Sequence, residues 1–456
     1  MRREYLEKHE LDMNCIPASR ILTQDRSDRS GFAGFDPGTM AKPLSMLLFV
    51  FIVSCSAPAS ESGMPQPMQE RAYGVDYRLR PDISRGGAFV ELEVSQNRGL
   101  LRELSMPLDA ERISNIGGDG QISIDDTRIR WVPPADGGRL HWFAKINHLR
   151  NSDTYDAFIS DDWAIFRAED VIPPTATRTL TGSVSRTRLM FDLPDGWTAV
   201  TEYFRRSNIF NVSNPDRRFD RPSGWIALGK LGVRHETIAG VRVIVAAPVH
   251  HAVRRMDILA MLNWTLPDLV RLLPGFPRRL TVISAGEPMW RGGLSAPGSL
   301  YIHASRPLIS ENGTSTIMHE AMHIGVGIGA VKGADWIIEG LAEYYSLEIL
   351  RRSGTITEKR YRTARSKLRS WGTDAKSLCA DASTGEITAR AVTLLARLND
   401  EISKKSNRKH DLDDVVRRVA GSADKISIPQ FRIIATDLAG SESEVLNDKI
   451  LGNCEN

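Results

Sequence analysis

The segment "IMHEAMHIG", residues 317–325, decides how the rest of this chain is interpreted. It holds His319 and His323 four positions apart, with Glu320 directly after the first histidine. On a helix, positions i and i+4 share one face, so both imidazoles can point at one metal ion. The surrounding residues are apolar, which predicts a buried helix. A buried carboxylate and two imidazoles need partners, and a divalent cation supplies one.

A second predicted helix, "DWIIEGLAEYYSLEILRR" (335–352), carries Glu339 and Glu343 one turn apart among apolar residues. Like charges at this spacing repel each other on an open helix. Both are accommodated if Glu339 completes a zinc site and Glu343 accepts a hydrogen bond from a ligand histidine. The longer zinc motif of the metzincins is excluded, because Val326 and Gly329 stand where that motif needs a glycine and a third histidine.

Together these two segments resemble the gluzincin zinc metallopeptidases, in particular the glycyl-aminopeptidase type of the aminopeptidase N clan. The shared pattern is HExxH followed by a helix reading W-x-x-E-G-hydrophobic-x-x-Y, here "WIIEGLAEYY" (336–345). Weaker similarity extends to "LPDGW" (193–197), to "RGGLSAPGSLYIH" (291–303) and to the helical pattern at 390–419. The resemblance implies an α+β fold with an N-terminal β-sandwich, a thermolysin-like catalytic domain containing the HExxH helix, and a C-terminal helical region.

The chemistry follows from this ligand set. The predicted cofactor is Zn²⁺, held by His319, His323 and Glu339, with Glu320 as the general base that activates water. The predicted partner is a peptide or protein substrate lying extended along the strand "SLYIHAS". The residues that the resemblance assigns to substrate binding are Gly292, Gly293, Leu294, Ser295 and Tyr301.

Two positions depart from the family pattern. Ser295 stands where a glutamate helps to hold the free amine of aminopeptidase substrates, and Thr388 stands where a tyrosine stabilises the oxyanion. Tyr301, His303 and Tyr361 are candidates to replace that hydroxyl. The sequence therefore leaves aminopeptidase and endopeptidase action both open. It also leaves an alternative, a weak or inactive pseudo-peptidase that binds peptides or a partner protein.

The order of patterns along the chain predicts the domain organisation. Short alternating strands separated by Gly, Pro, Asn and Asp run to about residue 248, and helical spacing takes over afterwards. The expected divisions are an extension upstream of the true start (1–39), a lipoprotein signal peptide (40–54), a tether (55–72), a β-sandwich (73–236), a zinc catalytic domain (237–370) and a helical region (371–456).

The N-terminal segment indicates export. The apolar run "LSMLLFVFIV" (44–53) is too short to span a bilayer but suits a signal peptide that starts at Met40. The following "IVSC" resembles a lipobox, with Cys55 as the lipidated residue. A buried helix with a structural cysteine is the alternative. The expectation is a bacterial lipoprotein anchored by lipid to the outer membrane and facing the periplasm or the cell surface.

Composition limits the remaining possibilities. Among 456 residues the net charge is only +3, which argues against nucleic acid as a partner. Four cysteines without a CxxC pair exclude a zinc ribbon or a disulfide-dense scaffold. In the mature chain Cys379 and Cys454 remain, either paired in an oxidising compartment or separately buried.

Overall fold

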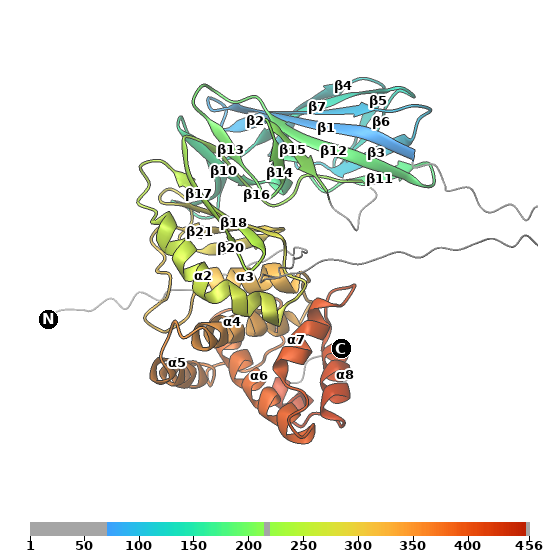
Figure 1. The fold of residues 1–456 in the computed structure, drawn as a ribbon. Coiled ribbons are helices and arrows are strands. Elements are labelled where there is room, and N and C mark those ends of the chain that lie inside the picture. Colours follow the sequence, from blue (N-terminus) through green and yellow to red (C-terminus); the bar gives the residue numbers. More distant parts are fainter. Residues whose placement is uncertain (1–70, 214–218, 453–456) are drawn as a thin grey trace, which may run out of the picture.

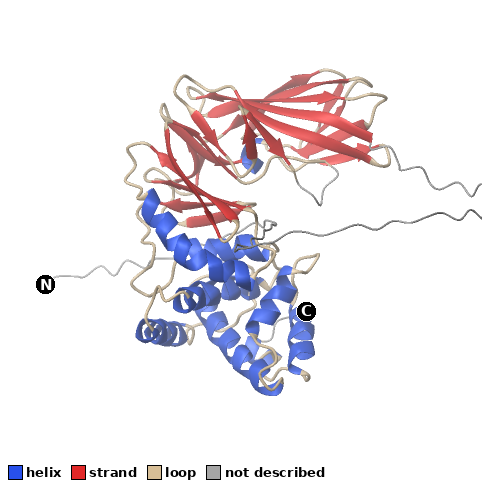
Figure 2. Ribbon diagram, in the orientation of Figure 1, coloured by secondary structure: helices blue, strands red, loops and turns tan. Residues whose placement is uncertain are grey.

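The computed structural model describes residues 71–213 and 219–452. A strand-rich N-terminal unit lies above a mixed unit, and a helical unit completes the chain, so the mixed α+β class is confirmed (Figures 1 and 2). The predicted leader, Cys55 and most of the predicted tether lie outside these residues. In the part of the chain that is described, no helix combines the length and the hydropathy needed to cross a membrane.

Three sheets build the N-terminal unit. The seven-stranded sheet has the order β14-β15-β12-β1-β2-β7-β4, formed by β1 (Arg71–Asp82), β2 (Gly87–Ser95), β4 (Ile113–Gly118), β7 (Gly137–Lys145), β12 (Ser183–Phe191), β14 (Phe204–Arg206) and β15 (Ile209–Val212). The four-stranded sheet, β11-β3-β6-β5, is formed by β3 (Leu101–Pro107), β5 (Gln121–Ile124), β6 (Arg128–Val132) and β11 (Ala176–Thr179). The five-stranded sheet, β13-β16-β10-β9-β8, is formed by β8 (His148–Leu149), β9 (Tyr155–Ile159), β10 (Trp163–Arg167), β13 (Thr198–Val200) and β16 (Trp225–Gly229), and α1 (Ala168–Val171) follows β10.

One hydrophobic core joins these sheets. In β2 the alternating sequence "GAFVELEVS" buries Val90 and Leu92 on one face while the glutamates point outward. These side chains share a cluster with Trp131 of β6 and Phe166 of β10. The sheets therefore pack face to face to remove these apolar faces from water. The central strands β10 and β16 are buried on both faces, and their second face packs toward the mixed unit.

The mixed unit contains a second five-stranded sheet, in the order β17-β18-β19-β21-β20. Its strands are β17 (Leu231–Ile238), β18 (Val241–Pro248), β19 (Arg279–Ala285), β20 (Gly293–Ala296) and β21 (Ser299–His303). The expected boundary between residues 236 and 237 falls inside β17. Because β17 pairs with β18 along its whole length, the mixed unit starts at Leu231 instead.

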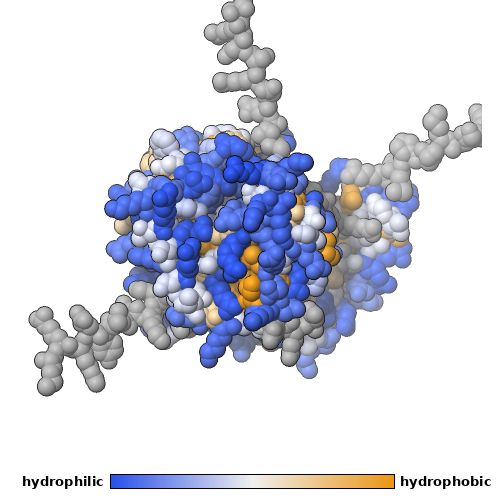
Figure 3. All heavy atoms as spheres, turned by 90° about the horizontal axis from the view of Figure 1, so that it is seen from below, coloured by the Kyte–Doolittle hydropathy of each residue, from blue (hydrophilic) through white to orange (hydrophobic). Residues whose placement is uncertain are grey.

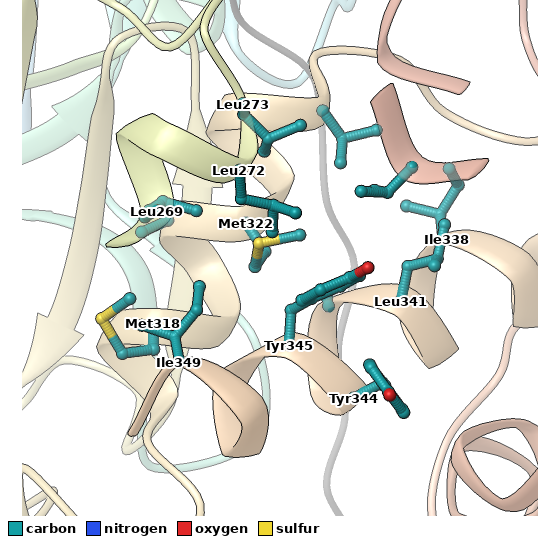
Figure 4. Packing of buried hydrophobic residues seen from close by; sticks show 14 of the residues in the cluster. Leu269, Leu272, Leu273, Met318, Met322, Ile338, Leu341, Tyr344, Tyr345 and Ile349 are labelled. Carbon is teal, nitrogen blue, oxygen red and sulfur yellow. The ribbon is translucent and has the colours of Figure 1, made fainter. Parts of the chain in front are cut away.

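Helices pack below this sheet and continue into the C-terminal unit (Figure 1). They are α2 (Arg255–Leu272), α3 (Thr316–Val326), α4 (Asp335–Arg352), α5 (Glu358–Trp371), α6 (Glu386–Lys405), α7 (Leu412–Ala420), α8 (Ile428–Ala439) and α9 (Asp448–Leu451). Apolar side chains of α2, α3 and α4, including Leu269, Met322 and Tyr345, form one cluster (Figure 4). The underside of the molecule is covered mainly by hydrophilic side chains (Figure 3).

Local sequence sets the limits of α3, the helix that carries the HExxH motif. The Ser315 hydroxyl accepts a hydrogen bond from the backbone N–H of Met318, which satisfies a donor at the helix start. Gly327 ends the helix with φ of 72°, a left-handed conformation that favours glycine. The eleven residues between these two caps hold both histidines.

Cys379 forms a disulfide bond. The alternative, in which Cys379 is a separately buried free thiol, is therefore excluded. The expected partner, Cys454, lies outside the described residues, so the pairing stays a prediction.

The mixed unit and the N-terminal unit are joined by buried hydrogen bonds. The Trp225 indole Nε1 donates to the Leu294 carbonyl at 2.9 Å, and the Trp225 backbone N–H donates to the Ser299 hydroxyl at 2.8 Å. The Thr281 hydroxyl donates to the Thr201 carbonyl at 3.3 Å. These contacts attach β16 to the two strands β20 and β21, so the N-terminal unit helps to position the sheet edge.

A carboxyl group lies in the same junction. Burial, together with the charge of nearby Glu169, raises the pKa of Glu202 to about 8, although the hydroxyls of Tyr203 and Ser223 and the charge of Arg279 oppose the shift. The folded protein therefore holds a proton here that the unfolded chain releases near pH 4.5. Stability falls as pH rises between these two values, because the folded state binds more protons than the unfolded state.

Replacing Glu202 with Gln removes this titration. We expect the stability of the parent protein to fall by more than about 1 kcal/mol between pH 5 and pH 8 relative to Glu202→Gln. Thermal unfolding of both proteins across this pH range measures the difference. Parallel pH profiles would contradict the assignment.

Helix α4 approaches α6 closely at Gly340. A Cβ atom at this position would lie 2.7 Å from the Ala391 Cβ and 3.0 Å from the Leu395 Cδ1. Gly329, in the loop after α3, has open space around the same position.

The Gly340→Val substitution is expected to lower the free energy of unfolding by about 2 kcal/mol, because the added methyls force the two helices apart. Denaturant unfolding measures the change. Gly329→Val is the matched control, and equal losses in both variants would show that packing against α6 is not the cause.

Candidate metal centre

Helices α3 and α4 bring His319, His323 and Glu339 into one cluster. The two imidazole Nε2 atoms lie 3.0 Å apart. Glu339 Oε2 lies 3.3 Å from His319 Nε2, and Glu339 Oε1 lies 3.4 Å from His323 Nε2. All three residues are at most 4% exposed. Helix α3 thus supplies two potential metal ligands from successive turns, and helix α4 supplies the third.

The electrostatics of the cluster follow from this proximity. Burial alone lowers the pKa of His319, but hydrogen bonds to Glu339 and Glu343 outweigh it and hold this pKa well above its ordinary value. Burial alone raises the pKa of Glu339, but the two histidines lower it to about 2. The two carboxylates therefore favour the protonated form of the His319 imidazole.

These residues fit a zinc ion. The ligand atoms of His319, His323 and Glu339 all lie within 4.8 Å of one another. Among the described residues Glu339 Oε2 is buried and its contact with His319 Nε2, at 3.3 Å, lacks good hydrogen-bond geometry; a carboxylate oxygen left so poorly satisfied inside a protein is costly. Two imidazoles and a carboxylate are a ligand set that catalytic zinc uses, with one coordination position left over.

Glu343 orients one ligand. Its Oε2 lies 3.1 Å from His319 Nδ1, and the Ser346 hydroxyl donates to the same oxygen at 3.4 Å. The contact directs Nε2 of His319, the opposite ring nitrogen, toward Glu339 and His323. A carboxylate in this position fixes the tautomer of a ligand histidine and increases its basicity.

Glu320 is 1% exposed and faces the edge of the sheet. A Cβ atom at Gly293 would lie 3.4 Å from Glu320 Oε1 and 2.4 Å from the Thr316 Cγ2. Glycine at position 293 therefore lets β20 pass directly over the start of α3. This close approach places the Glu320 carboxylate at the strand edge and next to the histidine cluster.

A pocket opens at this point between the sheet edge and the helices. Its wall is contributed by α3, α4, the end of α5, the start of α6 and the loops beside β20. The lining residues are Trp290, Gly292, Gly293, Arg306, Thr314, Thr316, His319, Glu320, Glu343, Leu368, Trp371, Gly385, Thr388 and Ala389.

The structure separates the five residues that were predicted to bind substrate. Gly292 and Gly293 line the pocket, whereas Leu294, Ser295 and Tyr301 do not. The last three are at most 3% exposed. Leu294 of β20 and Tyr301 of β21 pack in the apolar cluster at the junction with the N-terminal unit.

The expected peptide position along "SLYIHAS" is also corrected. This segment forms β21, which pairs with β19 on one side and β20 on the other, so neither of its edges is free. The edge strand of the sheet on this side is β20, Gly293–Ala296.

Thr388 lines the pocket, but its hydroxyl donates to the Ser383 carbonyl at 3.1 Å. None of the three candidates to replace the family tyrosine reaches the pocket in the described part of the chain. The Tyr301 hydroxyl donates to the Trp290 carbonyl at 3.1 Å, the His303 ring contacts Ser305, and the Tyr361 hydroxyl accepts from Arg365.

The sequence interpretation missed the residues that close the pocket, above all Arg306, Trp290 and Trp371. One signal was present, because Arg306 follows the predicted strand "GSLYIHAS" directly, and residues at strand ends often face a site. Trp290 stands in a loop whose course the sequence does not specify, and Trp371 ends α5, whose position against the pocket depends on long-range packing.

No family profile matches this sequence, and no curated protein is similar to it. Solved structures do match. An aminopeptidase N family protein from Idiomarina loihiensis has a TM-score of 0.56 at 16% identity, covering 76% of this chain and 70% of that one. A mutant M1 zinc metallopeptidase from Deinococcus radiodurans has a TM-score of 0.52 at 13% identity, covering 85% and 95%. Yeast LTA4 hydrolase in complex with bestatin has a TM-score of 0.54 at 14% identity, covering 88% and 71%.

The fold is that of the M1 zinc metallopeptidases. The resemblance inferred from the HExxH helix and the helix after it is thereby confirmed at the level of the fold. The roles of individual residues rest on the geometry described above.

The Glu343→Gln substitution is expected to weaken zinc binding about 10- to 100-fold, because it removes the carboxylate that orients His319. Competition with a chelator of known affinity measures the change. Glu320→Gln, which leaves all three ligands in place, is the control. Unchanged affinity in Glu343→Gln would show that the contact with His319 does not support the metal.

Proposed function

We propose that this chain is a zinc-dependent metallopeptidase that hydrolyses peptide bonds. The observation that carries the proposal is the buried cluster of His319, His323 and Glu339, whose member His319 lines the same pocket as Glu320. A site that binds metal only for stability needs no additional carboxylate facing a pocket. Glu320 is such a carboxylate.

The three ligands would hold the ion, and a zinc ion bound there supplies Lewis acidity toward a carbonyl group and toward water. Glu320 accepts a proton from the attacking water and later delivers it to the leaving amine. Glu343 keeps the His319 ring oriented during both steps. The wall formed by α5 and α6 limits the access of bulk water to these groups.

A peptide substrate fits the sheet edge. β20 is the edge strand, and an extended peptide can add main-chain hydrogen bonds to such an edge. Gly292 and Gly293 leave room for a second backbone to approach the Glu320 carboxylate closely. In this arrangement the scissile bond lies beside Glu320.

Attachment of lipid to Cys55 and a location at the outer membrane are further proposals, supported by the segment 44–55 of the sequence. They would hold the pocket close to a membrane.

Cleavage of a mixed peptide library by zinc-loaded protein from residue 56 onward tests the peptidase. We expect cleavage in the parent protein and a loss of about 100-fold or more in Glu320→Gln, because the general base is removed. Zinc content and thermal unfolding of the variant confirm that it is folded and loaded.

Cleavage that persists in Glu320→Gln would contradict the assigned base. A folded, zinc-loaded parent protein that cleaves nothing would overturn the proposal in favour of a peptide-binding pseudo-peptidase. The positions of the cuts would distinguish aminopeptidase from endopeptidase action.

A further inference from the structure

We propose that Arg306 selects substrates carrying a carboxylate group close to the scissile bond. The group is either the C-terminal carboxylate of a peptide or an Asp or Glu side chain. The inference rests on the proposed peptidase function and names the chemical class of its substrate.

Arg306 lies at the pocket in a loop that follows β21. Its side chain is partly buried and lines the same pocket as His319 and Glu320. A guanidinium remains charged under these conditions, so the pocket contains a fixed positive charge. A partly buried charge is costly unless an anion accompanies it.

The position of this guanidinium is held by the backbone. Arg306 Nε donates to the Arg291 carbonyl at 2.7 Å, and the Arg306 backbone N–H donates to the His303 carbonyl at 3.0 Å. Ordering of the side chain therefore precedes binding, which reduces the entropy lost when a ligand binds. The terminal nitrogens keep the planar geometry that suits a carboxylate.

Arg306 has no anionic partner within 4.0 Å among the residues that the structure describes. Two neighbouring arginines differ in this respect. Arg291 pairs with Glu287 at 2.5 Å, and Arg150 pairs with Asp156 at 2.8 Å while stacking on the Trp290 ring. Arg306 is thus the pocket-lining cation whose charge is left for a ligand.

The acidic groups of the pocket do not favour a positively charged ligand, such as the free amino group of a peptide. The two carboxylates in the lining are Glu320 and Glu343. Glu343 contacts His319, and Glu320 is required as the base. Ser295, at the position where the family pattern has an amine-binding glutamate, lies outside the pocket and is 1% exposed.

Apolar side chains complete the pocket. Trp290, Leu368 and Trp371 contribute to its wall together with three threonines. A ligand that combines a carboxylate with an apolar or aromatic side chain matches this composition. The chemistry therefore favours short peptides with an apolar residue beside the anionic group.

Binding is measured first, in a Glu320→Gln background loaded with zinc, so that turnover does not interfere. The probes are three acetylated peptides of equal length and with the same apolar residues. One has a free C-terminus, one is amidated, and one is amidated with a single internal Asp. Calorimetry gives the affinity for each.

We expect at least one carboxylate peptide to bind about 10-fold or more tightly than the neutral amide, as charge-assisted hydrogen bonds generally allow. The free-acid and Asp peptides distinguish the two sources of the carboxylate. Adding Arg306→Gln should abolish the difference, and Arg306→Lys should retain part of it. Arg291→Gln, which removes a neighbouring positive charge, should leave the difference unchanged.

Equal binding of all three peptides to the folded background protein would overturn the inference. The inference would also be overturned if Arg291→Gln lost as much of the preference for carboxylate peptides as Arg306→Gln. The general positive potential near the pocket would then explain that preference. If Arg306→Gln does not fold, Arg306→Lys replaces it, and an undiminished preference for the carboxylate peptides in Arg306→Lys would then count against the inference.

Cleavage is then measured with the catalytic base restored. Arg306→Gln should raise KM for the carboxylate peptides and leave kcat/KM for the amide unchanged. A fall in kcat for every peptide alike would overturn the inference, because Arg306 would then act on the reacting carbonyl. If the protein cleaves no peptide but still binds the carboxylate peptides more tightly than the amide, the result would count against the proposed peptidase function and not against the role of Arg306.

Discussion

The structure depends on burying two imidazoles and a carboxylate at one point between α3 and α4. His319, His323 and Glu339 are nearly inaccessible to water, and in that environment each needs the others or an ion. Their mutual contacts are stable only if the two helices stay in register. Apolar packing of α2 on one side and α6 on the other supplies that constraint, through the single large core of the mixed and helical units.

The same constraint explains the tight contacts around the centre. Gly293 lets the edge strand pass over α3, and Gly340 lets α6 press against α4. Each glycine removes the side chain that would otherwise separate two elements. The pocket is therefore formed by close approach of rigid elements, which suits a site that must hold Glu320 and three metal ligands in fixed positions.

The sequence was informative where function imposes a spacing. The four-residue interval from His319 to His323, and the W-x-x-E-G helix that follows, predicted two helices, their faces and the residues that meet. Strand alternation predicted the N-terminal sheets. The sequence could not show that β21 is enclosed on both sides, because pairing order is a long-range property. It also gave no sign that the Thr388 and Tyr301 hydroxyls are satisfied by nearby carbonyls, or that Arg306 faces the pocket.

One contact between units has a consequence for how such a protein can change over time. The Trp225 indole belongs to the strand-rich unit, yet it holds the carbonyl of Leu294 in the strand that borders the pocket. Exchange of the N-terminal unit for an unrelated one would release that strand. The sheet edge and the unit above it are therefore expected to be inherited together, as one block, even though they belong to separate sheets.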